Sequence, residues 1–397
     1  MSAEQYSSML GAKRDQLSSG AARELQVAVL GAGGTIAPAI VRDLAESDEV
    51  SGMLLLDIDE ERAADVARKH GGGKAKARRA NARGMASDHD SVTRAIERCD
   101  VLINSASYRV NLDTMRACVA TGTHYVDLGG LYWMTTRQLE LSSEFEDAGL
   151  VAILGIGSSP GKTNLMGLRA QRELDAAGGH VESMHVAAGG RDLEPPDGFS
   201  PPYAIQTLID ELTLKPVVLR DGKTCEIEPL TDGGKVDYGP PIGEVNTIYT
   251  LHSELNTFGS SFGARSVSFR LALHPSLLER LRKLSTCSAE RIARAQKNAL
   301  PPSPKTVSVH LVEAAGGGGE VRVRCLTKPS KRWRLGGGII STATPASAAV
   351  RLMARGEVTA RGALPPEKCL DPDSMFAELE ARGCEFDVEV GEGVISG

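Results

Sequence analysis

A glycine-rich turn between two apolar runs is the first group of residues whose spacing suits chemistry. Gly31, Gly33 and Gly34 follow the apolar run 27–30, and a helix-forming segment at 37–45 comes soon after them. Without side chains, such a turn lets backbone N–H groups approach a phosphate at the N-terminus of the helix. A second apolar run, 53–56, ends on Asp57, whose carboxylate can accept hydrogen bonds from a ribose. This order of strand, turn, helix, strand and acid predicts a dinucleotide-binding βαβ unit.

The contacts expected to the dinucleotide extend beyond the glycines. Ile36, at the start of the helix, occupies the position that usually holds a third glycine. Small residues follow the apolar run 101–104, at a strand end where a parallel sheet leaves room for a ligand. The loop at 155–161 adds one further expected contact. The predicted cofactor-binding residues are Gly31, Gly33, Gly34, Thr35, Ile36, Asp57, Ser105, Ala106, Ser107 and Pro160.

Asp57 also predicts which dinucleotide binds. A carboxylate at the end of the second strand favours the free 2′-hydroxyl of NAD and repels the 2′-phosphate of NADP. Arg62, five residues later on the following helix, is a cation that would compensate a phosphate. We expect NAD rather than NADP.

Polar side chains after other strands are candidates for catalysis and substrate binding. Tyr108 and Arg109 follow the run 101–106, and Asp127 follows the run 125–126. The carboxyl ends of parallel strands meet at one edge of a sheet, so these side chains should face the same crevice. An arginine there suits a substrate carboxylate, whereas Asp127 would hold an ammonium group or orient a base. The alternative for Asp127 is that it only caps the loop that continues through Gly129.

His252 is the histidine whose position most suggests a role. It follows the predicted strand 247–251 and precedes the polar run 253–257, which could line a pocket. A catalytic and a structural interpretation both stay open. The candidate catalytic residues are His252, Asp127 and Tyr108, and the candidate substrate-binding residues are Arg109, Asn164, Ser253 and Thr257.

Several other catalytic motifs are excluded by their spacing. The segment 155–163 ends in Gly-Lys-Thr, but the first glycine of a P-loop would fall at Ile156, so we interpret it as a turn that starts a helix at Lys162. None of the seven tyrosines is followed by the lysine of a Tyr-x-x-x-Lys pair, which disfavours a short-chain reductase. No His-x-x-x-His pair or acid cluster indicates a metal site.

Composition is that of an ordinary enzyme. The 397 residues are 41% hydrophobic and 24% charged. The net charge of −6 does not favour binding to nucleic acid or to an anionic membrane. No apolar stretch approaches the roughly 20 residues of a membrane span, and the first 23 residues lack a signal-peptide core. Seven scattered cysteines indicate buried thiols and a cytoplasmic location.

The pattern of elements predicts two α/β domains. Residues 1–22 form an expected helical or partly disordered extension, and 23–160 alternate strands with helices as in a Rossmann domain with a parallel sheet. Residues 161–342 predict a mixed, largely antiparallel sheet with helices at 203–214 and 276–297 and a hairpin at Asp221-Gly222. A helix near 343–360 is expected to complete the first domain, before a C-terminal segment at 361–397.

These residues together resemble one known family. Gly31-Ala32-Gly33, Asp57, the segments 104–106 and 125–130, and Ser159-Pro160-Gly161 with Asn164 resemble motifs of the saccharopine dehydrogenase-like family, and within it of the lysine 6-dehydrogenases. The resemblance implies a Rossmann domain, a second domain for substrate binding and dimerisation, and a homodimer. It also implies NAD-dependent oxidation of the ε-amine of lysine, a small amino-acid substrate, to allysine.

The implied reaction assigns roles to the candidate residues. The amine must lose a proton before hydride leaves its carbon, so a base must lie near it, and His252, Asp127 and Tyr108 are the candidates. Arg109 and Asn164 would hold the α-carboxylate or the nicotinamide amide. Two other functions stay open: a saccharopine- or carboxynorspermidine-type NADP-dependent reductase that joins an amine to a carbonyl compound, and a non-catalytic protein that senses NAD(P).

Overall fold

The computed structural model describes residues 22–84 and 88–392, which divide into two compact units. Apart from Ala22, the expected N-terminal extension lies outside the described residues. The first unit comprises the chain up to Gly157 together with Ala343–Met375. The second comprises Ser158–Thr342 and the chain from Phe376 onward. The division falls at Gly157/Ser158, three residues before the predicted boundary.

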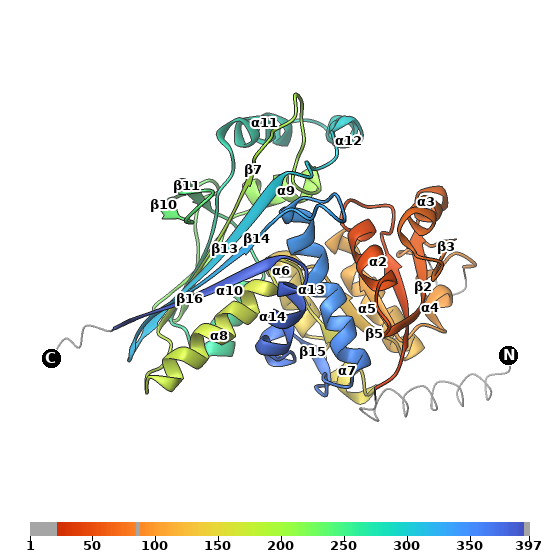
Figure 1. Ribbon diagram of the computed structural model, residues 1–397, viewed down its shortest axis with the longest axis horizontal. Helices are drawn as coiled ribbons and strands as arrows, with labels where there is room; N and C mark the ends of the chain where they lie inside the picture. Colours follow the sequence, from red (N-terminus) through yellow and green to blue (C-terminus); the bar gives the residue numbers. More distant parts are fainter. Residues whose placement is uncertain (1–21, 85–87, 393–397) are drawn as a thin grey trace. The chain divides into compact units, whose positions relative to one another are not determined.

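A parallel sheet forms the centre of the first unit (Figure 1). In the described residues it has seven strands in the order β15-β6-β5-β4-β1-β2-β3, the arrangement of a Rossmann domain. The strands β4 and β5 are buried along their whole length, because helices cover both faces of such a sheet. The strands are β1 (Leu25–Leu30), β2 (Val50–Asp57), β3 (Ala75–Arg79), β4 (Val101–Asn104), β5 (His124–Asp127), β6 (Val151–Ile153) and β15 (Gly362–Leu364).

Helices connect these strands. They are α2 (Ala37–Ala45), α3 (Glu60–His70), α4 (Val92–Ile96), the 3-10 turn η1 (Tyr108–Val110), α5 (Asn111–Thr121), α6 (Leu131–Leu139), α7 (Ser142–Asp147), the 3-10 turn η2 (Pro366–Lys368), and parts of α13 (Gly337–Ala354) and α14 (Pro372–Glu380). Their buried apolar side chains, such as Met115, Cys118 and Phe145, form one core with those of the strands.

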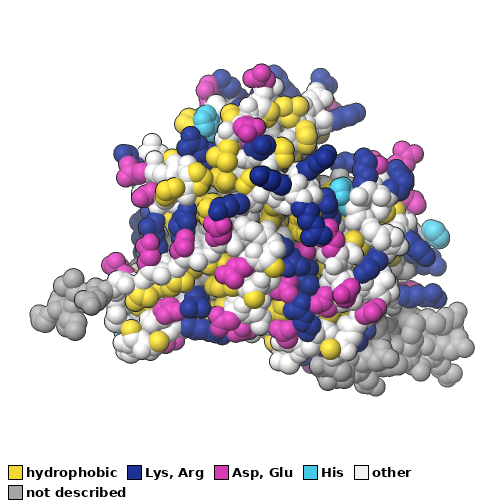
Figure 2. Space-filling model, in the orientation of Figure 1, with side chains coloured by type: hydrophobic (Ala, Val, Ile, Leu, Met, Phe, Trp, Pro, Cys, Tyr) yellow, Lys and Arg dark blue, Asp and Glu magenta, His cyan; other side chains and the backbone are white. Residues whose placement is uncertain are grey.

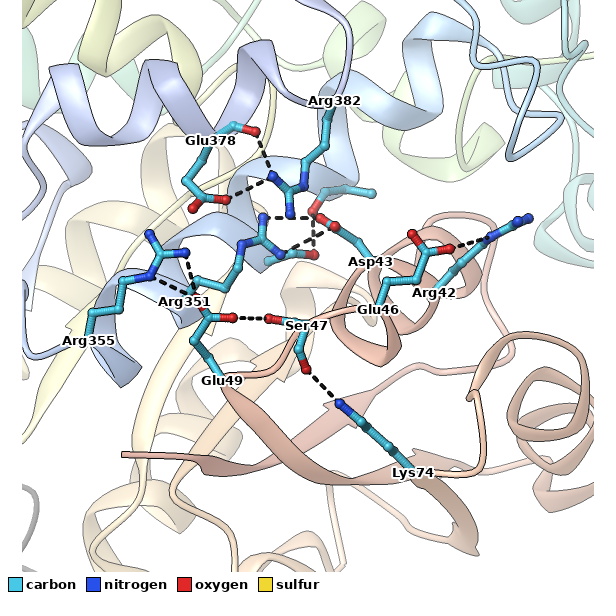
Figure 3. Close-up of polar contacts among 12 residues, drawn as sticks. Arg42, Asp43, Glu46, Ser47, Glu49, Lys74, Arg351, Arg355, Glu378 and Arg382 are labelled. Atoms are coloured by element: carbon cyan, nitrogen blue, oxygen red, sulfur yellow. Dashed lines mark hydrogen bonds and ion pairs between the residues drawn. The ribbon is translucent and has the colours of Figure 1, made fainter. Parts of the chain in front are cut away.

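The late helix α13 is tied to α2 by a buried ion pair (Figure 3). Arg351 Nη1 lies 3.3 Å from Asp43 Oδ1, and both side chains are only 2% exposed. On the surface nearby, Arg355 pairs with Glu49, which also accepts a hydrogen bond from the Ser47 hydroxyl. These contacts hold a segment some three hundred positions away in sequence within the first unit.

The second unit is built on a mixed, largely antiparallel sheet. Its path in the described residues is β10-β11-β12-β7-β13-β14-β16, with β8 paired to β12 and β9; only the β12–β7 pair is parallel. The strands are β7 (Ser183–Asp192), β8 (Val217–Arg220), β9 (Lys223–Glu226), β10 (Asp232–Asp237), β11 (Glu244–Tyr249), β12 (Ser266–Leu271), β13 (Thr306–Gly316), β14 (Gly319–Thr327) and β16 (Cys384–Glu392). The two sheets confirm the predicted fold class.

Local sequence signals decide the turns and helix ends of this unit. Asp221 and Gly222 both have positive φ, as expected for the two-residue hairpin turn between β8 and β9. The predicted helix 276–297 is wrong as a single element, because Ser288 accepts a hydrogen bond from the Arg291 N–H and starts a new helix. The helices are α8 (Lys162–Ala176), α9 (Ile205–Thr213), α10 (Glu254–Phe262), α11 (Pro275–Ser285) and α12 (Ala289–Asn298).

The C-terminal part of the chain is not the separate segment that the sequence predicts. β15 pairs in parallel with β6 of the first unit, whereas β16 pairs with β14 of the second along nine positions. Strand pairing therefore divides residues 361–392 between the units. The pattern of β16, in which Phe386, Val388 and Val390 alternate with acidic residues, is the period-two signal that the prediction missed.

The visible face carries charges of both signs (Figure 2), and the cysteines of the described residues are free. Lys and Arg are interspersed with Asp and Glu over the visible face (Figure 2). None of the helices in the described part of the chain has the length and apolar composition that a membrane span requires. All seven cysteines are free, but Cys225, Cys287 and Cys369 are partly exposed, so the expectation of buried thiols is wrong for these three.

The turn between β1 and α2 needs glycine for two separate reasons. Gly31 has φ +76°, in the left-handed region that side chains disfavour. A Cβ atom at this position would also lie 2.7 Å from the backbone N and Cα of Ala106, after β4. Gly73 provides a comparison, because it has φ +82° but open space around it.

We predict that Gly31→Ala destabilises the protein more than Gly73→Ala does. Gly73→Ala should cost about 1–2 kcal/mol from the left-handed backbone alone. Gly31→Ala should cost about 1–3 kcal/mol more, because the methyl group must displace the Ala106 backbone. Urea unfolding followed by circular dichroism measures both, and equal losses in the two variants would contradict the close approach of Gly31 to Ala106.

Candidate functional site

Helix α2 begins where the glycine turn ends, and the turn's polar groups are already organised. Gly31 N–H donates to Leu56 O and Gly34 N–H donates to Gly31 O. Ile36 is the N-cap of α2 and provides no side-chain cap. Pro38 has no N–H group, and the Ala39 N–H donates to Ile36 O. Thr35 is exposed beside the N-cap. The strand, turn and helix have the layout at which a dinucleotide phosphate binds.

Asp57 lies against the turn at the carboxyl end of β2. Its Oδ2 atom accepts the Gly33 N–H at 2.9 Å, and its Oδ1 atom accepts the Asp59 N–H at 2.9 Å. A Cβ atom on Gly33 would meet Arg62 Cβ at 2.8 Å and Asp57 Oδ2 at 3.2 Å. Arg62 also donates to Gly33 O. The Asp57 carboxylate and the Arg62 guanidinium therefore both contact the backbone of Gly33. The glycine turn and these two side chains fit a bound dinucleotide.

The end of β4 lies beside this turn. Ser105 donates through both its N–H and its hydroxyl to Leu30 O, at 3.0 and 2.7 Å, so it fixes the β1–β4 junction. Ser107 caps η1 by accepting the Arg109 N–H. Arg109 is exposed and lies 4.8 Å from the Tyr108 ring centroid. The structure therefore brings Ser105, Ala106, Tyr108 and Arg109 to one end of the parallel sheet.

Asp127 lies inside the first unit, at the centre of a hydrogen-bond network. Gln138 Nε2 and Asn111 Nδ2 donate to its Oδ2, at 2.6 and 3.1 Å, while the N–H groups of Gly129 and Gly155 donate to Oδ1. Burial raises the pKa of the carboxyl group, and the hydrogen bonds from Gln138, Gly155 and Gly129 oppose the rise. The geometry argues against the expected role as a base and supports the alternative, in which Asp127 organises the loop through Gly129.

The network continues through Asn104 at the end of β4. Asn104 Nδ2 donates to Asn111 Oδ1 at 2.9 Å and to the Tyr125 hydroxyl at 3.2 Å, and its Oδ1 accepts the Ala106 N–H. The side chains of Asn104, Asn111, Tyr125, Asp127 and Gln138 are thus buried and mutually bonded. Such a network fixes the loops after β4 and β5.

In the second unit, α8 begins at Lys162 as the sequence predicts. Asn164 Oδ1 accepts the Gly161 N–H at 2.8 Å and closes the first turn of the helix. Lys162 Nζ is buried and donates to Thr327 Oγ1 and Ser341 Oγ. The lysine is therefore not presented to a phosphate, unlike that of a P-loop. Pro160, an expected cofactor contact, also belongs to this unit.

His252 lies between β11 and α10, in the second unit, and is flanked by two carboxyl groups. Its Nε2 atom is 3.9 Å from Glu211 Oε1, and its Nδ1 atom is 3.9 Å from Glu254 Oε2. Neither ring nitrogen has a hydrogen-bond partner within the described residues. The ring stacks on Phe269 of β12, with centroids 3.6 Å apart. Burial lowers the pKa of His252 to about 3, so the imidazole is neutral.

Further polar atoms around His252 also lack partners in the described chain. They are the hydroxyl oxygens of Thr250 and Thr257, both buried. Ser253, another expected substrate contact, is the N-cap of α10. Most buried polar groups in proteins are hydrogen-bonded, so several unpartnered atoms within residues 250–257 indicate a place for a polar ligand.

The two carboxyl groups are held in different ways. Glu254 Oε1 accepts the hydroxyls of Ser159 and Thr163, each at 2.7 Å, which joins α10 to the start of α8. Glu211, on α9, accepts the Tyr203 hydroxyl at 2.5 Å through Oε2. Burial, together with the nearby Asp210 and Glu254, raises the pKa of Glu211 to about 8, against the opposing hydrogen bond from Tyr203.

Sequence reasoning missed Glu211, Glu254 and Tyr203. Glu254 lies within the polar run 253–257 that was singled out, so its signal was present. Glu211 lies 41 positions before His252, on the predicted helix 203–214, among apolar residues such as Leu208 and Leu212. An acid on the buried face of an amphipathic helix was the signal that could have found it. In the described residues, no group of three or more His, Cys, Asp or Glu side chains could hold a metal ion.

Comparison with known proteins agrees with this geometry. Residues 27–153, which contain the glycine turn and Asp57, match the family model of the saccharopine dehydrogenase NADP-binding domain. The match confirms the resemblance indicated by the sequence motifs, and it shows that this domain is of a kind that binds a nicotinamide dinucleotide.

Two similar proteins extend the likeness beyond this domain. The chain is 27% identical over 200 residues to carboxyaminopropylagmatine dehydrogenase from Synechocystis sp., a match that covers 49% of each protein. The chain thus spans about half the length of this relative. Its fold is similar to that of apo saccharopine dehydrogenase (L-Glu forming) from Saccharomyces cerevisiae, with a TM-score of 0.68, 16% identity, and coverage of 92% of this chain and 100% of that one.

Proposed function

We propose that this protein is a nicotinamide-dinucleotide-dependent oxidoreductase that acts on a C–N bond of an amine. The observation that carries the proposal is the cluster of His252, Glu211 and Glu254, in which unpartnered imidazole nitrogens lie between two buried carboxyl groups. Such a cluster suits a cationic amine, because a buried charge needs a partner of opposite sign. When bound at the glycine turn, the nicotinamide would donate or accept the hydride.

Within this reaction class, we propose that the enzyme joins a cationic amine to a carbonyl compound and reduces the resulting imine. The name of the Synechocystis relative, which denotes a substituted agmatine, supports this direction. Oxidation of the lysine ε-amine, which the sequence motifs predict, uses the same type of bond in the opposite direction. Both reactions require a neutral amine, either to attack the carbonyl carbon or to release hydride from its own carbon, and the His252 cluster would bind the amine in either case.

The other polar residues of the cluster would position the amine. The fixed Glu254 carboxyl group would attract the cation, and the Thr257 hydroxyl would accept or donate a hydrogen bond to the ligand. Arg109, Asn164 and Ser253 remain proposed substrate contacts. A small amine or amino acid as substrate, and a homodimer as the assembly, complete the proposal.

The proposal predicts oxidation of the reduced dinucleotide only when an amine and a carbonyl compound are both present. The assay follows absorbance at 340 nm with agmatine, putrescine or lysine, each with and without a four-carbon amino-acid aldehyde. Formation of reduced dinucleotide from lysine alone would instead support lysine oxidation. Tight dinucleotide binding without turnover of any amine would support a non-catalytic sensor.

The histidine can be tested in the same assay with a matched control. His252→Ala should lower kcat/KM by about 100-fold or more, because the variant loses the imidazole that would contact and position the amine nitrogen. His185→Ala changes a histidine in the same unit that is bonded to Ser268 at 2.8 Å, and it should retain activity. Equal losses in both variants would contradict the assignment of His252.

We also propose that NAD is the preferred coenzyme, because Asp57 is bound to the Gly33 N–H at the end of β2. The name of the matching family model favours NADP, and Arg62, on the same glycine, is the residue that would bind a 2′-phosphate. Asp57→Ala should weaken NAD binding by about tenfold or more and leave NADP binding intact, whereas Arg62→Ala should weaken only NADP binding. Titration of each variant with both dinucleotides measures this, and an equal loss of both in Asp57→Ala would overturn the preference for NAD.

A further inference from the structure

We propose that Glu211 carries the proton of the substrate amine, which binds as a cation between Glu211 Oε1 and His252 Nε2. This inference rests on the proposed function and adds the residue that makes the amine nucleophilic. Sequence motifs suggested His252, Asp127 and Tyr108 for this task, but a neutral histidine of low pKa holds a proton poorly. In the described chain, Glu211 is the acid that lies on the Nε2 side of this ring.

The spacing of the two groups suits a bridging nitrogen. At 3.9 Å, Glu211 Oε1 and His252 Nε2 are too far apart for a direct hydrogen bond. A single nitrogen atom about 2.9 Å from both would bridge them at an angle close to a right angle. The stacked Phe269 ring restrains the imidazole.

Tyr203 determines which carboxyl oxygen faces the amine. Its hydroxyl donates to Glu211 Oε2, so Oε1 is left on the side of His252. Gln206 binds the neighbouring Asp210 through Oδ1, on the same helix. Tyr203 is therefore a positioning residue for Glu211.

The electrostatic surroundings of Glu211 favour the protonated form of its carboxyl group as long as no cation is bound beside it. The titratable and charged groups facing it are Tyr203, Asp210, Glu254 and His252, none of which is positively charged at neutral pH. With a pKa of about 8, Glu211 is mostly protonated at pH 7. A cationic amine stabilises the ionised form, so its binding displaces the carboxyl proton into solvent.

The remaining steps then balance. Glu211, now ionised, takes a proton from the bound ammonium group, and the amine lone pair attacks the carbonyl carbon to form the C–N bond. Glu211 returns its proton as the carbinolamine loses its oxygen as water. The product is a protonated imine, and the dinucleotide, when bound in its reduced form, would supply the hydride that makes it a secondary amine.

Calorimetry measures the displaced proton without turnover. Agmatine is titrated into the full chain in phosphate and in Tris, whose different ionisation enthalpies report the protons released per amine bound. Wild type should release about 0.9 proton at pH 7 and about a quarter of a proton at pH 8.5, as expected for a group with a pKa near 8. Glu211→Gln, which keeps the shape of the side chain, should release none at pH 7.

Tyr203→Phe is a control for which the direction of the change in proton release can be predicted. The Tyr203 hydrogen bond lowers the pKa of Glu211, so its removal should increase proton release at pH 8.5 relative to wild type. Release of no proton by wild type at pH 7, or equal release by wild type and Glu211→Gln, would overturn the inference. If the enzyme turns over an amine and a carbonyl compound without this release, only the role of Glu211 fails. If agmatine, putrescine and lysine neither bind nor react, both the proposed function and the role of Glu211 fail.

Discussion

A polar side chain buried in a protein needs a hydrogen-bond partner, and the two units of this chain meet that requirement differently. In the first unit, Asn104, Asn111, Asp127 and Gln138 bind one another and the backbone, so the loops after β4 and β5 are fixed. In the second, His252 is as deeply buried but both its nitrogens lack a partner in the described chain. A closed network stabilises a fold, whereas an open one indicates a ligand.

This difference separates two carboxyl groups that look alike in sequence. Burial raises the pKa of both Asp127 and Glu211. Four donors saturate Asp127, so it serves the scaffold of the dinucleotide-binding unit. Glu211 has a tyrosine on one oxygen, and its other oxygen lies 3.9 Å from His252 Nε2, so we propose that it exchanges a proton for a cationic amine. The proposed chemistry therefore depends on a hydrogen bond that the fold leaves unmade.

The sequence is a good guide where structure is local. The β1 strand, glycine turn, α2 helix and β2 strand span about thirty residues, and backbone preference and apolar pattern decide each of them. The hairpin at Asp221-Gly222 and the start of α8 at Lys162 could be predicted for the same reason. By contrast, the network around Asp127 joins side chains from β4, β5, α5 and α6 to backbone groups of two loops, and no local pattern shows that Asn111 and Gln138 bind the carboxylate. Glu211 was missed because its meeting with His252, which lies between β11 and α10, depends on the tertiary packing of α9, and the periodicity of the helix alone indicated a buried structural face.

The most direct test of this account is a crystal structure of the protein with agmatine and the oxidised dinucleotide bound. The account predicts the amine nitrogen within about 3.2 Å of both Glu211 Oε1 and His252 Nε2, and the pyrophosphate at the glycine turn of Gly31 and Gly33. A fully occupied amine bound elsewhere, with His252 and the two carboxyl groups unchanged, would contradict it.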